Sequence, residues 1–396
     1  MSLTRNEPDM TQAPLTGRDP RLDFFRGLCL AMIFINHVPG QIYETFTSRN
    51  FGFTDAAEGF VFMSGAAAGL AYSIGMMTRP LWPTVGKIWG RVWLLYLVHV
   101  MTAFLAIAIS AATLKFAGVD TLIERANVQW LGKDMLGFLI GVPTLGHQLG
   151  YVNILPMYMV LLAAAPFMIK LAQWRVWALL ASVTVIWALA GQFRIDLPNY
   201  PTKGGWFFNP ISWSIIFALG LATGIRLKQG RRLVLVNRWL IGLASAYLLL
   251  SLVWLKQPDV NYAMARSMSY LWDHGFPFWV VGMDKTYVAL PRLLHLMSLA
   301  YLLSLPGPIR MISGSRWVAP IVTLGRNSLP VFAFGTVLAF VGQSIKVTYD
   351  LNFAQDTALI VTGLTLQWAL ARAREWHKAQ IKAARSPAPK APLATR

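Results

Sequence analysis

An apolar stretch of membrane length near the N-terminus, residues 21–38, carries side chains that could do chemistry. Arg26 and His37 are eleven residues apart, which in an α-helix is about 1100°, within about 20° of three full turns. Both side chains therefore lie on one side of the helix, about 16 Å apart along its axis. An ionisable group at membrane depth costs roughly 2.5–3.5 kcal/mol on insertion scales, so this pair needs partners or a chemical task.

Two carboxylates open the next apolar stretch. Asp55 and Glu58 are three residues apart and share one helix face, and the short connection from His37 places Glu58 at a similar depth. A carboxylate beside an imidazole fixes its tautomer and raises its basicity. A buried, paired histidine can act as a general base toward a hydroxyl. The other reading is a structural polar link between two helices, and the residues alone leave both open.

The composition is that of a polytopic membrane protein. Of the 396 residues, 56% are hydrophobic and only 13% are charged, whereas about a quarter of a soluble domain is charged. The single cysteine, Cys29, excludes an internal disulfide framework and a cysteine-based metal site, and the carboxylates are too scattered to predict a metal cluster. No cleavable signal is expected, so the first apolar segment is interpreted as a retained span.

The hydropathy pattern predicts an all-α polytopic membrane protein with about ten transmembrane helices. The segment Met135–Val142 is apolar but too short to cross, so it is expected to be interfacial or re-entrant. The expected spans are Asp23–Tyr43, Asp55–Met77, Ile88–Leu114, Tyr151–Ile169, Trp174–Gln192, Pro210–Ile225, Trp239–Leu255, Tyr287–Leu305, Leu324–Ile345 and Phe353–Ala371.

Around these spans we expect a simple domain organisation. Residues 1–20 form a cytoplasmic N-terminal arm and residues 21–372 form one membrane domain. Residues 373–396 form a basic cytoplasmic tail that first extends the last helix and is then partly disordered, because it becomes rich in proline and alanine.

The basic residues are divided unevenly between the two faces of this membrane domain. The side that holds both termini has 23 of the 35 Lys and Arg and 5 of the 17 Asp and Glu, whereas the opposite side has 11 and 12. This asymmetry predicts that both termini are cytoplasmic. It also explains the net charge of +18 without a nucleic-acid partner. Arg26 is then expected in the inner leaflet and His37 near the outer face.

Several segments in order resemble a known family. RLDFFRGL followed by His37 has the R-x10-H spacing of the acyltransferase-three superfamily of membrane acyltransferases. Within that superfamily the chain is similar to the OpgC family, and the resemblance runs from about Asp19 to Arg372. The further segments that carry it are FTDAAEGFVFMSGAAAGLAY, NILPMY, NPISW and GRNSLPVF.

The resemblance implies a multi-pass enzyme of the bacterial inner membrane that transfers succinyl groups to hydroxyls of osmoregulated periplasmic glucans. Succinyl-CoA would be the cytoplasmic co-substrate, and no permanently bound cofactor or metal is expected. The expected partners are membrane lipid, the acyl-CoA donor, a glucan or other polysaccharide acceptor and glucan-synthesis proteins, with no nucleic acid.

On this reading His37, oriented by Glu58 or Asp55, takes the proton from a glucan hydroxyl, whose oxygen attacks the acyl carbonyl while CoA leaves. Arg26 would stabilise an anion of the donor, either a CoA phosphate or the succinyl carboxylate. An acyl-histidine intermediate is the other route. Further residues expected to line the substrate site are Asp23, Asn36, Ser64, Tyr158, Asn209, Trp213, Arg326 and Asn327.

Three other functions stay open. One is a sibling enzyme that uses acetyl-CoA or another acyl donor, or a different surface polysaccharide as acceptor. Another is a transporter or flippase, for which inverted repeats with broken helices would be expected and are not evident. The third is a non-catalytic partner of a glucan synthase, and the intact Arg26 and His37 argue against it.

Overall fold

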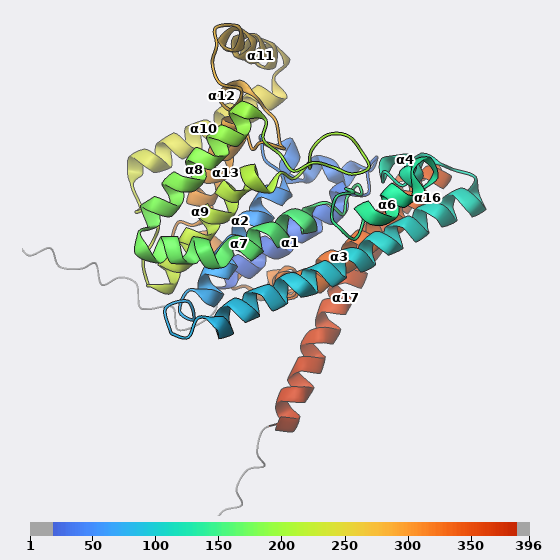
Figure 1. The fold of residues 1–396 in the computed structure, drawn as a ribbon, viewed down its shortest axis with the longest axis horizontal. Coiled ribbons are helices and arrows are strands. Elements are labelled where there is room, and N and C mark those ends of the chain that lie inside the picture. Colours follow the sequence, from blue (N-terminus) through green and yellow to red (C-terminus); the bar gives the residue numbers. More distant parts are fainter. Residues whose placement is uncertain (1–18, 386–396) are drawn as a thin grey trace, which may run out of the picture.

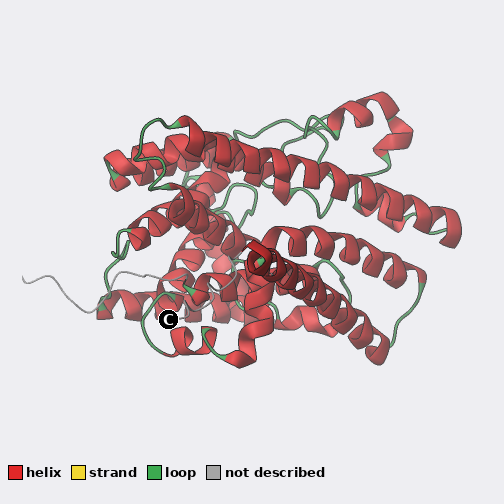
Figure 2. Cartoon of the chain, turned by 90° about the horizontal axis from the view of Figure 1, so that it is seen from below, coloured by secondary structure: helices red, strands yellow, loops and turns green. Residues whose placement is uncertain are grey.

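The computed structural model describes residues 19–385, and over that range the chain consists of helices and loops without a β-strand (Figures 1 and 2). The fold class is therefore all-α, as predicted. The α-helices are α1 Pro20–Asn36, α2 Ala56–Tyr72, α3 Trp82–Ala117, α4 Thr121–Arg125, α5 Trp130–Lys133, α6 Met135–Gly141, α7 Ile154–Trp174, α8 Val176–Phe193, α9 Pro210–Lys228, α10 Arg238–Lys256, α11 Pro258–Asp273, α12 Phe278–Val281, α13 Leu290–Leu303, α14 Pro308–Ser313, α15 Ala319–Arg326, α16 Ser328–Thr348 and α17 Phe353–Arg385. Short 3-10 helices are η1 Ile42–Phe46, η2 Ser48–Asn50 and η3 Arg316–Val318.

Six helices of the described chain are long and apolar enough to cross a membrane by length and composition, namely α3, α7, α8, α9, α10 and α16. Several long apolar helices of this kind fit a multi-pass membrane protein. The remaining expected spans correspond to α1 and α2, of 17 residues each, to the 14-residue α13 and to α17. The expected total of about ten spans is thus matched for six.

Some expected boundaries were wrong. The first helix ends at Asn36 and not at Tyr43, because Pro39 and Gly40 follow and the chain turns into η1. The span expected over Leu324–Ile345 is broken at Asn327, where the backbone leaves the helical region with φ −111° and ψ 36°, so α15 and α16 are separate helices.

Two further segments differ from or extend the sequence prediction. The stretch after α10, expected as a loop, contains the 16-residue helix α11. Helix α17 continues past Ala371 to Arg385, so the expected extension into the basic tail is present. The rest of that tail, and all of the expected N-terminal arm before Asp19, lie outside the described residues.

Glycines allow the two central helices α2 and α9 to cross at backbone contact. A Cβ on Gly65 would lie 2.1 Å from the Phe217 carbonyl oxygen, and one on Gly220 would lie 1.9 Å from the Phe62 carbonyl oxygen. Gly69 and Gly224 repeat this arrangement one turn later, so each helix presents a G-x-x-x-G face. Such faces bring membrane helices together where apolar burial alone gives little driving force.

The same device fixes α1, the helix that carries Arg26. A Cβ on Gly27 would lie 1.9 Å from the Ile321 carbonyl oxygen of α15, and one on Gly325 would lie 1.8 Å from the Asp23 carbonyl oxygen. Helices α1, α2, α7 and α9 occupy the middle of the bundle in Figure 1, while α17 and α11 extend from opposite ends of it. The central helices therefore position the polar side chains of the site.

Candidate active site

His37 is held by its backbone and by ring packing. It caps the C-terminus of α1, and its carbonyl oxygen accepts a hydrogen bond of 2.7 Å from the Gln343 amide of α16. Its ring meets the Tyr151 ring edge-on, with centroids 4.6 Å apart. The Nδ1 atom is buried and has no hydrogen-bond partner among the described residues. A buried polar atom without a hydrogen bond lowers the stability of the fold by about 1–3 kcal/mol. Such an atom therefore calls for an explanation, and a catalytic role is one.

The two carboxylates near His37 cap the start of α2. Asp55 accepts a hydrogen bond from the Ala57 amide at 2.8 Å, and Glu58 accepts one from the Asp55 amide at 3.0 Å, which together form a capping box. The pattern D-x-x-E that suggested general acid–base chemistry is therefore also a helix N-terminus signal.

Both carboxylates also bind cations that come from the far half of the chain. Asp55 forms an ion pair with Lys285, and Glu58 forms one with Arg292, whose Nε donates to Glu58 Oε1 at 3.0 Å. The structure describes no hydrogen bond between His37 and either acid, and the described side-chain partners of Asp55 and Glu58 are these two cations. The His37 ring still lies within electrostatic range of Asp55 and Lys285.

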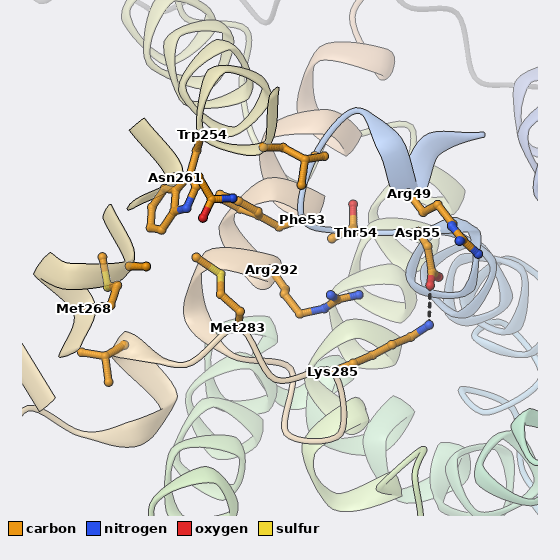
Figure 3. A pocket seen from close by; sticks show the side chains of 14 residues that line it. Arg49, Phe53, Thr54, Asp55, Trp254, Asn261, Met268, Met283, Lys285 and Arg292 are labelled. Carbon is orange, nitrogen blue, oxygen red and sulfur yellow. Dashed lines mark hydrogen bonds and ion pairs between the residues drawn. The ribbon is translucent and has the colours of Figure 1, made fainter. Parts of the chain in front are cut away.

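A cavity of about 430 Å³ opens beside these charges, and we name it the Asp55 cavity (Figure 3). It lies between the N-terminus of α2, helices α10 and α11, and the start of α13. Its lining residues are Arg49, Gly52, Phe53, Thr54, Asp55, Trp254, Leu255, Asn261, Ala265, Met268, Val281, Met283, Lys285 and Arg292. This is the size range in which proteins bind small organic groups.

A second cavity of about 330 Å³, the Arg26 cavity, lies farther along α2. Arg26 lines this cavity, and its guanidinium donates a hydrogen bond of 3.1 Å to the Met63 carbonyl oxygen. The same guanidinium lies 3.7 Å from the Asp23 carboxylate. Its lining residues are Arg26, Phe60, Ser64, Ala67, Ala68, Ala71, Tyr72, Arg91, Leu95, Leu155, Tyr158, Ser328, Leu329 and Phe332. With two guanidinium groups and two phenols in its wall, this cavity suits an anionic group.

The two cavities follow each other along α2. Asp55 belongs to one and Phe60 to the other, five residues or about 8 Å of helix rise apart. Phe60 stacks on Phe332 of α16 with centroids 5.9 Å apart, and both rings line the Arg26 cavity.

The sequence prediction of lining residues is met for some and not for others. Arg26, Ser64 and Tyr158 line one cavity together. The remaining residues line neither of the two cavities described, and their side chains hold the fold. Asn36 accepts a hydrogen bond of 2.8 Å from the Thr47 hydroxyl. Asn209 is the N-cap of α9 and donates a hydrogen bond of 2.7 Å to the Ile195 carbonyl oxygen.

The other non-lining residues serve contacts between elements. Trp213 is fully buried, and its indole N–H donates a hydrogen bond of 3.1 Å to the Lys285 carbonyl oxygen. This hydrogen bond fixes the loop that carries Lys285. Asn327 donates 3.1 Å to the Thr323 carbonyl oxygen at the break between α15 and α16. Arg326 is half exposed and lies 3.8 Å from Asp23, so it belongs to the Arg26–Asp23 group without entering the cavity.

Sequence reasoning missed four residues of these cavities and their rims. Lys285 and Arg292 lie at and after the end of a long loop, and Arg91 lies inside an apolar helix. His295 is buried in α13, where its Nδ1 lies 2.7 Å from Thr54 Oγ1. The available signal was the same as for Arg26, since an ionisable residue in an apolar run needs a partner or a task.

A family model described as OpgC protein matches residues 18–379, which is most of the chain. No curated protein and no solved structure matches.

Proposed function

The chain belongs to the OpgC family, and from this premise we propose that it transfers a succinyl group from succinyl-CoA to hydroxyl groups of periplasmic glucans. Family membership itself implies a membrane acyltransferase. The donor, the acceptor and the location in the bacterial inner membrane belong to the proposal. One arrangement supports it: a cavity lined by Arg26 and Arg91 and a cavity lined by Asp55 and Lys285 both border α2, and His37, which lines neither, lies within electrostatic range of Asp55 and Lys285.

In the proposed reaction the acceptor hydroxyl gives its proton to His37, and its oxygen attacks the thioester carbonyl. The carbon–sulfur bond then breaks, an ester forms, and the CoA sulfur leaves as a thiol after taking up the proton. A neutral imidazole can accept the proton from the hydroxyl and then return it to the leaving sulfur, so it suits both halves of this transfer. The ion pairs of Asp55 and Glu58 would keep the surrounding polar surface rigid.

The Arg26 cavity is proposed to hold the donor. Arg26 and Arg91 would bind an anion of the acyl-CoA, and the thioester arm would extend past the Phe60–Phe332 pair toward His37. With the termini in the cytoplasm, the donor would enter from the cytoplasmic side and the glucan from the periplasmic side. The abundant basic residues of the terminal side support this orientation.

The direct test is His37→Ala in purified protein, with CoA release measured in the presence of succinyl-CoA and a periplasmic glucan. Loss of a general base is expected to lower kcat by about 10²–10⁴-fold. His274→Ala is the matched control, because His274 is exposed at the end of α11 and is expected to leave the rate unchanged. A wild-type rate in the His37 variant would overturn the assignment of the general base.

The same assay separates the other functions. Acetyl-CoA in place of succinyl-CoA tests the acyl group, and an unrelated surface polysaccharide tests the acceptor. An enzyme releases CoA only when the acceptor is present. Transport of intact glucan without any thioester consumption would contradict the proposal and favour a flippase.

A further inference from the structure

The walls of the Asp55 cavity are of two kinds. Figure 3 shows Arg49, Asp55 and Lys285 on one side of the cavity and Trp254, Asn261 and Met268 on the other. One wall therefore offers donors and an acceptor for hydrogen bonds, while the other offers an aromatic ring, a thioether and an amide. Cavities with one polar and one aromatic wall suit ligands that have both hydroxyl groups and apolar faces.

The charges in this cavity are compensated. Lys285 is paired with Asp55, Arg292 with the buried Glu58, and Arg49 with Glu44 at 3.3 Å. The cavity thus lacks the uncompensated positive charge that would attract an anion from solution. The Asp55 and Lys285 side chains are still 23% and 21% exposed, so both can form further hydrogen bonds with a ligand.

The aromatic wall is positioned firmly and faces outward. Trp254 of α10 packs edge-on against Phe53 with ring centroids 5.2 Å apart, which fixes the orientation of the indole. Asn261 and Ala265 of α11 are exposed, so the cavity opens at this helix, at the edge of the bundle (Figure 1). A long polymer can therefore place one of its units in the cavity while the rest stays outside.

We propose that the Asp55 cavity binds a neutral sugar unit of the acceptor, with Trp254 as its stacking surface and Asp55, Lys285 and Asn261 as hydrogen-bond partners of its hydroxyls. This inference rests on the proposed function, because that function requires an acceptor sugar whose hydroxyl reaches His37. Asp55 and Lys285 are the link, since they line the cavity and act electrostatically on the His37 ring.

The test is Trp254→Ala in the full-length protein, with an oligosaccharide of unsubstituted glucose as the probe. Loss of a stacking surface is expected to raise the KM for this acceptor by roughly tenfold, while the KM for the acyl-CoA donor stays constant. Trp254→Phe keeps an aromatic face and should recover most of the affinity. Asn261→Ala, on the exposed α11, is a second variant that tests the same cavity if Trp254→Ala fails to fold.

Trp239→Ala is the matched control, because Trp239 lies at the other end of α10 and is 75% exposed. An unchanged acceptor KM in Trp254→Ala and Asn261→Ala overturns the inference and leaves the acyl transfer standing. A clear preference for an oligosaccharide of uronic acids over one of glucose also overturns it. Saturation-transfer NMR separates the two proposals: glucose oligosaccharide bound by the wild type and lost in Trp254→Ala supports the sugar site even if no CoA is released.

Discussion

Glu58 is the most deeply buried member of the charged cluster, with only 1% of its side chain exposed. Its charge is stabilised by Arg292, which is 14% exposed and lies 234 positions along the chain. Removing both ions from water is costly, so such a pair adds little net stability, whereas leaving one ion alone is expensive. The pair is therefore expected to fix how α2 and α13 are joined beside His37.

Replacing Arg292 by methionine is expected to destabilise the protein strongly. A buried carboxylate without its cation costs about 3–5 kcal/mol. The double variant Glu58→Gln with Arg292→Met should recover much of this loss, because no buried charge remains. Thermal unfolding in detergent measures both. Arg49→Met is the control, since that cation is 47% exposed and its ion pair is worth about 0–1 kcal/mol. Equal small losses in Arg292→Met and Arg49→Met would contradict the expected role.

For single residues, the sequence predicts which polar side chains are buried in the membrane domain better than it predicts which residues they interact with. Arg26, Ser64 and Tyr158 were recognisable because polar groups in apolar helices demand a reason, and they share one cavity. The partners of Asp55 and Glu58 were not recognisable, because 230 and 234 positions separate them from Lys285 and Arg292. The D-x-x-E motif of Asp55 and Glu58 also forms a capping box, whose hydrogen bonds are local and involve no histidine. The motif alone therefore did not show that these acids act on His37.

At the scale of helices, the α2–α9 and α1–α15 contacts are formed by glycines that let the two backbones touch, as much as by large apolar side chains. The G-x-x-x-G faces of α2 and α9 are visible in the sequence, but glycine alone does not say which helix it faces. Hydropathy located the long helices well but failed at some of their ends, because it averages over Pro39 and Gly40 after α1 and does not show the backbone break at Asn327. The helical type of the elements was thus easier to predict than their number or boundaries.

Gly220→Val is expected to destabilise the α2–α9 crossing. The new Cβ would lie 1.9 Å from the Phe62 carbonyl oxygen, which is closer than van der Waals contact. Because that oxygen belongs to the backbone of α2, the two helices would have to move apart. Overpacking of this kind costs about 1–3 kcal/mol or more. Gly242→Val in α10 is the control, because its Cβ would meet nothing within 4 Å and the change in helix propensity is the same. The melting temperature and folded yield in detergent distinguish the two, and similar losses in both variants would show that the crossing is tolerant.

For the whole molecule, the distribution of charge and the directions of the helices make one joint prediction about the membrane. Helix α17 runs from Phe353 to Arg385, and Arg374 lies 21 residues from its start, about 32 Å along the axis, which matches the thickness of a bilayer core. Ser267 lies exposed on α11, beyond the end of α10 that is far from the basic loop Arg226–Arg232. If the basic side is cytoplasmic, these two positions face opposite sides.

Cysteine labelling in bacterial cells tests this arrangement directly. The one native cysteine, Cys29, is 7% exposed, so the wild type should react little with a membrane-impermeant maleimide. Ser267→Cys is expected to react in intact spheroplasts, and Arg374→Cys only after the membrane is permeabilised. The reverse pattern would place both termini outside and would put the Arg26 cavity on the wrong side for a cytoplasmic thioester. Labelling of both positions from one side would mean that the number of crossings between them is even, which removes α13, α16 or α17 from the set of spans.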